Sequence, residues 1–244
     1  MKIYIIYESF KKKEIIINKW GFEHDKKSLI ALIIKNDRLE VFKRDEPNLG
    51  NFWIDFSHKK LIYRIQSNLL KKEAIAKAIG IKNNYHPNIL DATAGSGRDA
   101  FILSALGCKV CMVERNPIIA ALLDDGLKRN YKNNKINILI KEKMNLIYES
   151  SFNVFKILKS KPDIVYLDPM YPILKKNMPK KNVNFLRLLI GKDADAENLL
   201  ELARKCSKKR VIVKRPRYGP YLSGLKTTYT IFSKKNRFDI YSPL

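Results

Sequence analysis

The stretch ILDATAGSGRDAFILSALGCKVCMVER, residues 89–115, decides the fold. It begins with a short apolar segment that predicts a buried strand ending in Asp91, and a loop of small residues follows. After the loop, the sequence predicts a helix over 98–106 and a second strand over 110–113 that ends in Glu114. Two parallel strands joined by a helix need a right-handed crossover, so the stretch indicates a parallel α/β sheet.

The loop of small residues is suited to a ligand. Gly95 and Gly97 allow a tight turn, so a ligand can lie against the main chain at the N-terminus of the helix. Glu114, at the tip of the second strand, is placed to accept hydrogen bonds from two ribose hydroxyls. The unit therefore predicts a cofactor that contains a nucleoside.

Two classes of cofactor fit such a unit. The run from Gly95 to Ala100 satisfies a G-x-G-x-x-A pattern, which keeps a nicotinamide oxidoreductase open. However, Asp91 and Asp99 would repel a pyrophosphate, whereas an acid before the glycines suits an amino group and a sulfonium. The run D-A-T-A-G-S-G resembles the first motif of S-adenosylmethionine (SAM) methyltransferases. This resemblance implies SAM as the cofactor.

The charge of the chain favours a polyanionic partner. Its 244 residues include 48 Lys and Arg against 24 Asp and Glu, a formal net charge of +24. Such a charge is typical of nucleic-acid binding. The alternative is codon drift toward Lys, Ile and Asn, which KKKEIIINK and YKNNKINILIKEK suggest. Basic residues also crowd the edges of the predicted site, which favours RNA or DNA: Lys175, Lys176, Lys180, Lys181, Lys214, Arg215 and Arg217.

Neither a membrane segment nor a metal site is expected. The chain has no run of about twenty apolar residues, and its N-terminal apolar patch is too short for a signal peptide, so we expect a cytoplasmic protein. Cys108 and Cys111 have C-x-x-C spacing, but positions three apart on a strand point to opposite faces. The three histidines are scattered along the chain.

The remaining segments predict a lobe, a linker and a core. We expect a small β-rich N-terminal lobe over 1–65, a helix and linker over 66–88, and the methyltransferase domain over 89–244. The lobe should contain strands over 2–7, 28–34, 39–43 and 52–56, with Trp20, Trp53 and Phe56 in its core. The linker helix is expected over 71–79.

Further elements of the core follow the pattern of a class I, Rossmann-like methyltransferase. Helices are expected over 118–129 and 196–206, the second capped by Asp193 or Asp195. Strands are expected over 136–140, 163–167, 210–213, 228–233 and 237–241, the last two as an antiparallel hairpin. The fold class is therefore α/β, with a seven-stranded mixed sheet closed by that hairpin.

A second motif follows the strand over 163–167. Asp168-Pro169-Met170-Tyr171 is similar to the (D/N)-P-P-(Y/F) motif of methyltransferases that act on exocyclic or amide nitrogens, with Met170 in place of the second proline. An exocyclic amine is a poor nucleophile, because its lone pair is delocalised into the ring. Asp168 could orient this nitrogen and offset the charge that develops on it, and Tyr171 could stack on the base. We therefore predict Asp168 and Tyr171 as catalytic residues.

Longer blocks carry a closer resemblance. They resemble the RsmJ family of bacterial 16S ribosomal RNA (guanine-N2) methyltransferases: DATAGSGRDAF, ERNPIIAALLDDGLKR, VYLDPMYP, VIVKRPRYGP and RFDIY, with GFEHD and KRDEPNLG nearer the N-terminus. The resemblance covers nearly the whole chain. It implies methyl transfer from SAM to the N2 amine of one guanine in 16S rRNA, presented as naked rRNA or in the 30S particle.

The motifs together predict the cofactor-binding residues, which are Asp91, Gly95, Gly97, Arg98, Asp99, Glu114, Arg115, Ser150, Ser151 and Asp168. By the resemblance, Ser150 and Ser151 would flank the adenine, and Asp168 would reach the methionine end and the target amine. The chain departs from the family in two places. The segment from Tyr63 to Leu70 lacks the glycines of a basic, glycine-rich segment, and Arg217 stands where an acid is expected.

Two further hypotheses remain open at this point. One is a methyltransferase of the same class that acts on another base or on an amide nitrogen, because D-P-M-Y alone does not exclude it. The other is an RNA-binding ribosome-assembly factor whose catalysis has decayed. Intact Gly95, Gly97, Glu114 and Asp168 argue against such decay.

Overall fold

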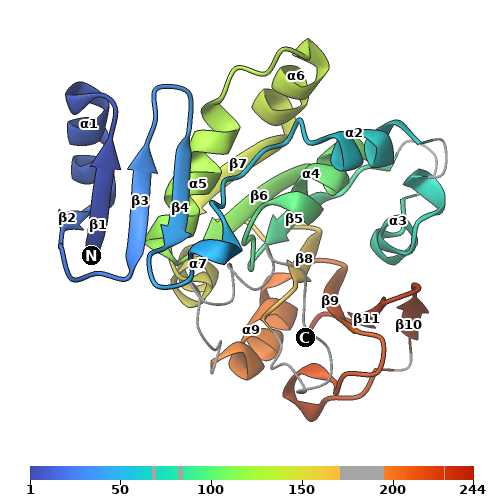
Figure 1. Cartoon of the computed structure of the whole chain (residues 1–244). Coiled ribbons are helices and arrows are strands. Elements are labelled where there is room, and N and C mark those ends of the chain that lie inside the picture. The colour runs from blue at the N-terminus through green and yellow to red at the C-terminus, as the bar shows by residue number, and fades with distance from the viewer. Residues whose placement is uncertain (68–69, 82–84, 171–194, 228) are drawn as a thin grey trace.

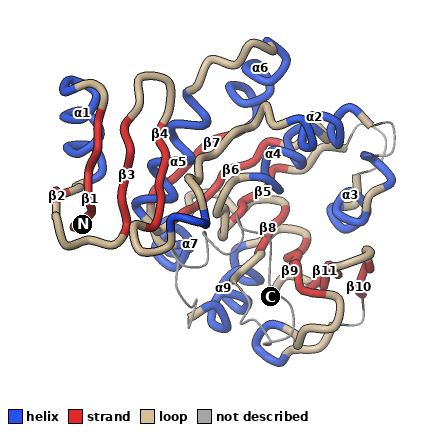
Figure 2. The backbone as a smooth tube through the Cα atoms, in the orientation of Figure 1, coloured by secondary structure: helices blue, strands red, loops and turns tan. Residues whose placement is uncertain are grey.

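The computed structural model describes residues 1–67, 70–81, 85–170, 195–227 and 229–244. Two β-sheets stand side by side (Figure 1). The smaller sheet belongs to the N-terminal lobe and has the strand order β2-β1-β3-β4, and the larger has the order β10-β11-β9-β8-β5-β6-β7. Figure 2 shows helices flanking both sheets. The fold is therefore a seven-stranded α/β sheet with an additional small lobe, as the sequence predicts.

The larger sheet is mixed. Its parallel strands are β5 (Asn88–Asp91), β6 (Lys109–Glu114), β7 (Met144–Tyr148), β8 (Ile164–Leu167) and β9 (Arg210–Pro216). The hairpin of β10 (Tyr229–Phe232) and β11 (Asn236–Tyr241) closes the sheet, and β11 runs antiparallel to β9. Successive strands β5, β6 and β7 extend to one side, after which the chain returns to β8 on the other side of β5. Ligands bind at such a switch point, outside the carboxyl ends of the strands.

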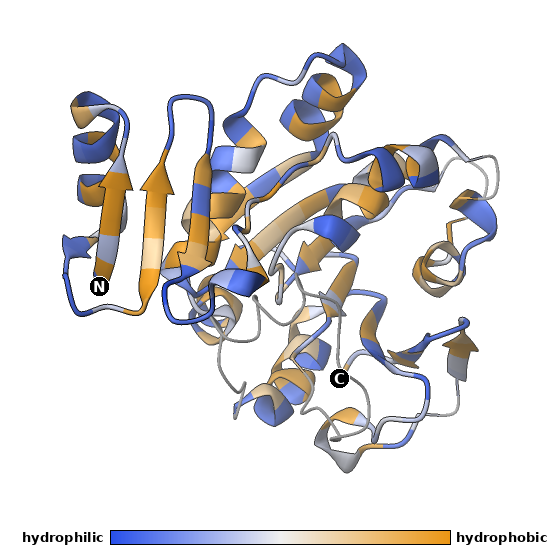
Figure 3. Cartoon of the chain, in the orientation of Figure 1, coloured by the Kyte–Doolittle hydropathy of each residue, from blue (hydrophilic) through white to orange (hydrophobic). Residues whose placement is uncertain are grey.

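Helices cover both faces of this sheet. On one face, α4 (Arg98–Ala105), α5 (Pro117–Lys128) and α6 (Asn134–Lys143) contribute buried residues to a large apolar cluster. On the other face, α7 (Ser151–Ile157) and α9 (Leu199–Cys206) pack in a second cluster. Cys108 belongs to the first cluster and Cys111 packs against the second, so the two thiols lie on opposite faces as predicted. Figure 3 shows the apolar strands between these layers.

The prediction of a strand over 136–140 is wrong, because these residues lie in α6 and the strand is β7, over Met144–Tyr148. Alternating Ile136, Ile138 and Ile140 suggested a strand. In the structure Ile136 and Ile140 are buried one helical turn apart, whereas Ile138 is 54% exposed. The Asn133 side chain caps the helix by accepting a hydrogen bond from the Lys135 N–H at 3.0 Å.

The N-terminal lobe is less purely β than predicted. Strands β1 (Lys2–Tyr7), β3 (Ile30–Ile34) and β4 (Leu39–Lys43) agree with expectation, and the short β2 (Glu23–His24) adds to them. The helix α1 (Phe10–Trp20) was not expected. It connects β1 to β3, which run parallel and therefore need a crossover.

The strand predicted over 52–56 is also wrong. Only Phe52 pairs with the lobe, through an isolated bridge to Val41. Beyond it the chain leaves the sheet, because Phe56 packs on α4 with its ring 5.0 Å from that of Phe101. Trp20 and Phe56 are buried as predicted, but Trp53 is 41% exposed.

The lobe and the larger sheet share one core. Residues of both belong to the same apolar cluster. Polar contacts add to it: Lys19 pairs with Asp124 of α5 at 2.6 Å, and the Leu39 N–H donates to Asp125 at 3.0 Å. The segment that connects the lobe to the larger sheet contains α2 (Lys59–Gln66) and α3 (Ala74–Ile79). Gly80 ends α3 in the left-handed conformation. No helix among the described residues is long and apolar enough to span a membrane.

Candidate active site

The glycine loop follows β5 at the switch point. Its backbone is held by two neighbouring strands, since the Ala92 N–H donates to the Tyr166 carbonyl at 3.0 Å and the Ala94 N–H to the Val113 carbonyl at 3.1 Å. Gly97 has φ 69°, and a Cβ there would lie 2.8 Å from Leu123 Cδ1. Only glycine therefore lets the loop turn and pack directly on α5.

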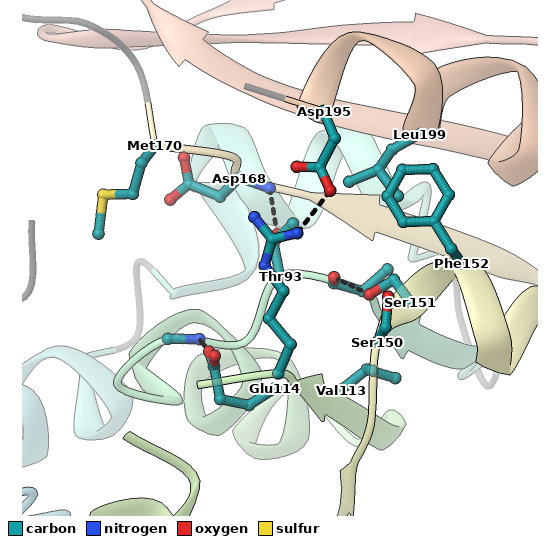
Figure 4. Close-up of a pocket in the computed structure, with 13 residues that line it drawn as sticks. Thr93, Val113, Glu114, Ser150, Ser151, Phe152, Asp168, Met170, Asp195 and Leu199 are labelled. Carbon is teal, nitrogen blue, oxygen red and sulfur yellow. Dashed lines mark hydrogen bonds and ion pairs between the residues drawn. The ribbon is translucent and has the colours of Figure 1, made fainter. Parts of the chain in front are cut away.

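Glu114 ties the tip of β6 to this loop. One of its carboxylate oxygens accepts the Gly95 N–H at 3.0 Å (Figure 4). The other accepts the Asn116 N–H at 2.8 Å. The residue is only 6% exposed, but it lines a cavity beside the loop. Both of these bonds come from backbone N–H groups, and a carboxylate has about four acceptor positions in all.

The cavity collects residues from the carboxyl ends of several strands. Six of the predicted cofactor residues line it: Gly95, Glu114, Arg115, Ser150, Ser151 and Asp168. The other lining residues among those described are Ala92, Thr93, Val113, Phe152, Met170, Asp195 and Leu199. The structure therefore brings together residues that are up to about a hundred positions apart in the sequence.

Ser150 and Ser151 lie where α7 begins. The Ser151 hydroxyl donates to the Ala92 carbonyl, which fixes the start of the helix against the glycine loop (Figure 4). Ser150 occupies the N-cap position and also lines the cavity. Both serines therefore line the cavity beside the glycine loop, as does Phe152.

Arg115 and Asp195 pair beside the cavity. The Arg115 Nη1 atom lies 2.6 Å from an Asp195 oxygen, and each side chain is 41% exposed. The prediction that Asp195 caps the following helix is wrong, because its side chain makes no capping hydrogen bond. The ion pair with Arg115 engages this carboxylate instead and lowers its pKa. The alternative cap, Asp193, lies outside the described residues.

Asp168 is positioned from two sides. Its backbone N–H donates to the Thr93 hydroxyl at 2.6 Å, which joins the end of β8 to the glycine loop (Figure 4). Its carboxylate accepts a hydrogen bond from Lys214 Nζ at 2.8 Å. One hydrogen bond therefore holds the backbone of Asp168, and another holds its carboxylate.

Lys214 also binds a second carboxylate. Its Nζ atom lies 2.6 Å from Asp99 Oδ2, which in turn accepts a hydrogen bond from the Tyr166 hydroxyl at 2.7 Å. One ammonium group thus bridges Asp99 and Asp168. The predicted cofactor residues Asp91, Gly97, Arg98 and Asp99 do not line the cavity in the structure. Asp91 and Gly97 are buried behind the loop, Asp99 joins the Lys214 network, and Arg98 is exposed.

The electrostatics of the network follow from burial and pairing. Although 40% of the Asp168 side chain is accessible, the carboxylate is otherwise surrounded by protein, and this burial raises its pKa against the opposing effect of Lys214. Burial would lower the pKa of Lys214, but the two carboxylates outweigh it and raise that pKa. Lys214 lowers the pKa of Asp99 despite burial. Burial raises the pKa of Asp91 to about 8.

Other predicted residues stand apart from this group. Tyr171, Lys175, Lys176, Lys180 and Lys181 lie outside the described residues. Arg215 is 4% exposed, and its Nε donates to the Pro220 carbonyl at 3.0 Å, so the prediction that it contacts RNA is wrong. Among the described residues, no group of three or more His, Cys, Asp or Glu could hold a metal ion.

Sequence reasoning missed the roles of Thr93, Asp195 and Lys214 at the site. The available signal was strongest for Lys214, a charged residue directly after the buried run Val211–Val213 in a parallel strand. The two partners of Lys214 are Asp99 and Asp168, which lie 115 and 46 positions away in the sequence. No local pattern connects them to Lys214.

Comparisons with known proteins identify the family. The sequence profile of the family described as putative SAM-dependent methyltransferase matches residues 15–243. The chain is 48% identical to ribosomal RNA small subunit methyltransferase J of Buchnera aphidicola subsp. Schizaphis graminum, over 100% of this chain and 98% of that protein. It is 47% identical to the protein of the same name from Erwinia tasmaniensis, over 94% of this chain and 92% of that one.

A solved structure agrees with these relatives. The crystal structure of a SAM-dependent methyltransferase from Neisseria gonorrhoeae superposes with a TM-score of 0.76 at 30% identity, and the match covers 100% of this chain and 96% of that one. The cofactor of the family is SAM. The chain belongs to the ribosomal RNA small subunit methyltransferase J family of SAM-dependent methyltransferases.

Proposed function

We propose that the protein transfers the methyl group of SAM to the N2 amine of a guanine in 16S rRNA. The observation that carries this proposal is the position of Asp168, which lines the cavity at the switch point and is held there by Thr93 and Lys214. The names of the relatives supply the small-subunit rRNA as the substrate class. The RsmJ motifs in the sequence supply guanine N2 as the acceptor.

The residues around the cavity fit SAM. Gly95 lines the cavity, and among the described residues a Cβ at this position would meet only the Thr93 carbonyl, at 4.0 Å. Glu114 would accept the ribose hydroxyls, and Ser150 and Ser151 would flank the adenine. SAM supplies an electrophilic methyl group on its sulfonium.

Asp168 would act on the acceptor nitrogen. Its carboxylate accepts an N–H bond of the guanine amine, orients the nitrogen lone pair and offsets the positive charge that forms as the methyl group arrives. The amine then loses a proton, which the hydrogen-bonded Asp168 carboxylate would accept. Lys214 opposes the rise in the pKa of this carboxylate that burial causes, and it holds the carboxylate in place.

Such an enzyme would work on rRNA or on assembling small subunits. The net charge of +24 suits this partner, because phosphate contacts dominate the affinity of proteins for RNA. A protein with a ribosomal substrate would reside in the cytoplasm of a bacterium.

Transfer of a radiolabelled methyl group tests the proposal. Unmodified 30S particles, naked 16S rRNA, duplex DNA and protein would each be incubated with the enzyme and labelled SAM. We expect label in 16S rRNA or in the rRNA of the particle, and none in DNA or protein. Label in DNA or protein would indicate another acceptor. Tight RNA binding without any transfer would instead favour the ribosome-assembly factor.

A further inference from the structure

A group of exposed aromatic and basic side chains lies at the end of the hairpin. We define the hairpin platform as Arg217, Tyr218, Phe232, Lys234 and Lys235. Tyr218 is 90% exposed and Phe232 is 56% exposed. The Arg217 guanidinium lies near both rings, 5.8 Å from the centroid of Tyr218 and 5.2 Å from that of Phe232. Two exposed rings beside one guanidinium form a surface on which bases can stack.

The backbone beneath these side chains is held in place. The Arg217 N–H donates to the Lys235 carbonyl at 3.0 Å, and its Nη1 donates to the Ser233 carbonyl at 2.8 Å. From below, buried Arg237 donates to the carbonyls of Arg217 and Gly219, at 3.1 and 2.6 Å. The platform is therefore pre-organised, which lowers the entropy cost of binding.

The platform lies at the same edge of the sheet as the active site. Asn236 pairs with Pro216, so the turn of the hairpin stands beside the carboxyl end of β9. On that strand, Lys214 contacts Asp168. Arg217 follows Lys214 by three residues, a span of roughly 10 Å along an extended chain. This separation suits a nucleotide one or two positions from a base that enters the site.

The charge of the platform favours RNA over a protein partner. Among the described residues, no carboxylate forms an ion pair with Arg217, Lys234 or Lys235. Unpaired cations beside aromatic faces are the pattern of single-stranded nucleic-acid binding, in which bases stack and cations meet phosphates. A duplex would hide its base faces, so the platform suits an unpaired strand.

We infer that the hairpin platform binds the single-stranded RNA that flanks the target guanine, with a base stacked on Tyr218 or Phe232 and its phosphates near Lys234 and Lys235. This inference rests on the proposed function, because it takes rRNA as the substrate.

The experiment compares the double variant Tyr218→Ala/Phe232→Ala with the wild type. We expect the double variant to bind naked 16S rRNA about tenfold or more weakly, as loss of base stacking predicts. In steady-state methyl transfer the effect should fall on KM for RNA rather than on kcat. Tyr218→Phe/Phe232→Tyr keeps both rings and should restore the affinity.

Tyr229→Ala is the matched control. Tyr229 is also exposed, at 57%, and lies on the same hairpin, but it pairs with Ile240 at the opposite end. Its loss should leave RNA affinity unchanged. Unchanged RNA affinity in the double variant, or an equal loss in Tyr229→Ala, would overturn the inference. A loss confined to assembled particles would overturn it too, because a ribosomal protein would then be the partner. Absence of methyl transfer by the wild type would instead contradict the proposed function.

Discussion

Lys214→Met should shift the pH dependence of methyl transfer to higher pH. In the proposed mechanism Asp168 accepts a hydrogen bond from the amine, so it must be ionised. Burial already raises its pKa, and Lys214 opposes this rise from 2.8 Å. Activity should therefore be present above the pKa of Asp168 and lost as the pH falls through it. Methionine removes the opposing charge with little change in side-chain length.

The size of the shift follows from the contacts of Lys214. An opposite charge at such a distance shifts a carboxyl pKa by about 1–3 units, and one unit corresponds to about 1.4 kcal/mol. Removal of Lys214 also takes away the ammonium group that pairs with Asp99, and the negative charge of Asp99 raises the pKa of Asp168 further. We therefore expect the acidic limb of the rate profile to move upward by at least about one unit.

Single-turnover methyl transfer with saturating RNA and SAM, from mildly acidic to mildly alkaline buffers, measures this limb. Lys214→Arg keeps the charge and should leave the limb near its wild-type position. Lys209→Met, at an exposed position before the same strand, controls for the loss of a positive charge elsewhere. A Lys214→Met profile that is lowered equally at every pH would refute the reasoning, because it would show that Lys214 does not set the ionisation of Asp168.

Four other predictions concern the cofactor, the acceptor, the RNA and the core. Glu114→Ala should weaken SAM binding at least about tenfold in calorimetry, because charge-assisted bonds to ribose are lost; unchanged affinity in a folded variant would contradict the assignment. Asp168→Asn should slow single-turnover transfer by about two to four orders of magnitude while RNA binding, followed by filter binding, changes little; near-wild-type turnover would contradict the mechanism. RNA affinity should fall steeply with salt, and a flat plot of log affinity against log salt would favour codon drift as the origin of the charge. Burial raises the pKa of Asp91 to about 8, so the wild type should become less stable as the pH rises from the ordinary Asp value toward 8. Asp91→Asn should lose this pH dependence of stability in urea unfolding. Parallel plots of stability against pH for the two proteins would show that Asp91 is not the group responsible.

Local patterns predicted the elements that line the cavity at the switch point. The βαβ unit over 89–115 was predicted because a strand, a glycine turn and a helix all follow one another within it. Asp168 was predicted because D-P-M-Y directly follows a buried strand. Each of these patterns depends on neighbours in sequence, and the structure places Gly95, Glu114 and Asp168 around one cavity.

Interactions between distant segments could not be predicted in the same way. The bridge from Lys214 to Asp99 and Asp168 depends on the order of the strands, and the pair of Arg115 with Asp195 joins residues 80 positions apart in the sequence. The error over 136–140 has another cause. Its alternating isoleucines fit a strand, and only the packing of α6 shows that Ile138 faces outward.

The most direct measurement of the central claim is the chemical identity of the methylated nucleoside. Unmodified small subunits would receive a deuterated methyl group from labelled SAM, and the rRNA would then be digested and analysed by mass spectrometry. The account predicts that the mass-shifted product is N2-methylguanosine from a single site, and that Asp168→Asn produces little of it in the same time. A labelled methyl group on another nucleoside, or on N2 of guanines throughout the rRNA, would contradict it.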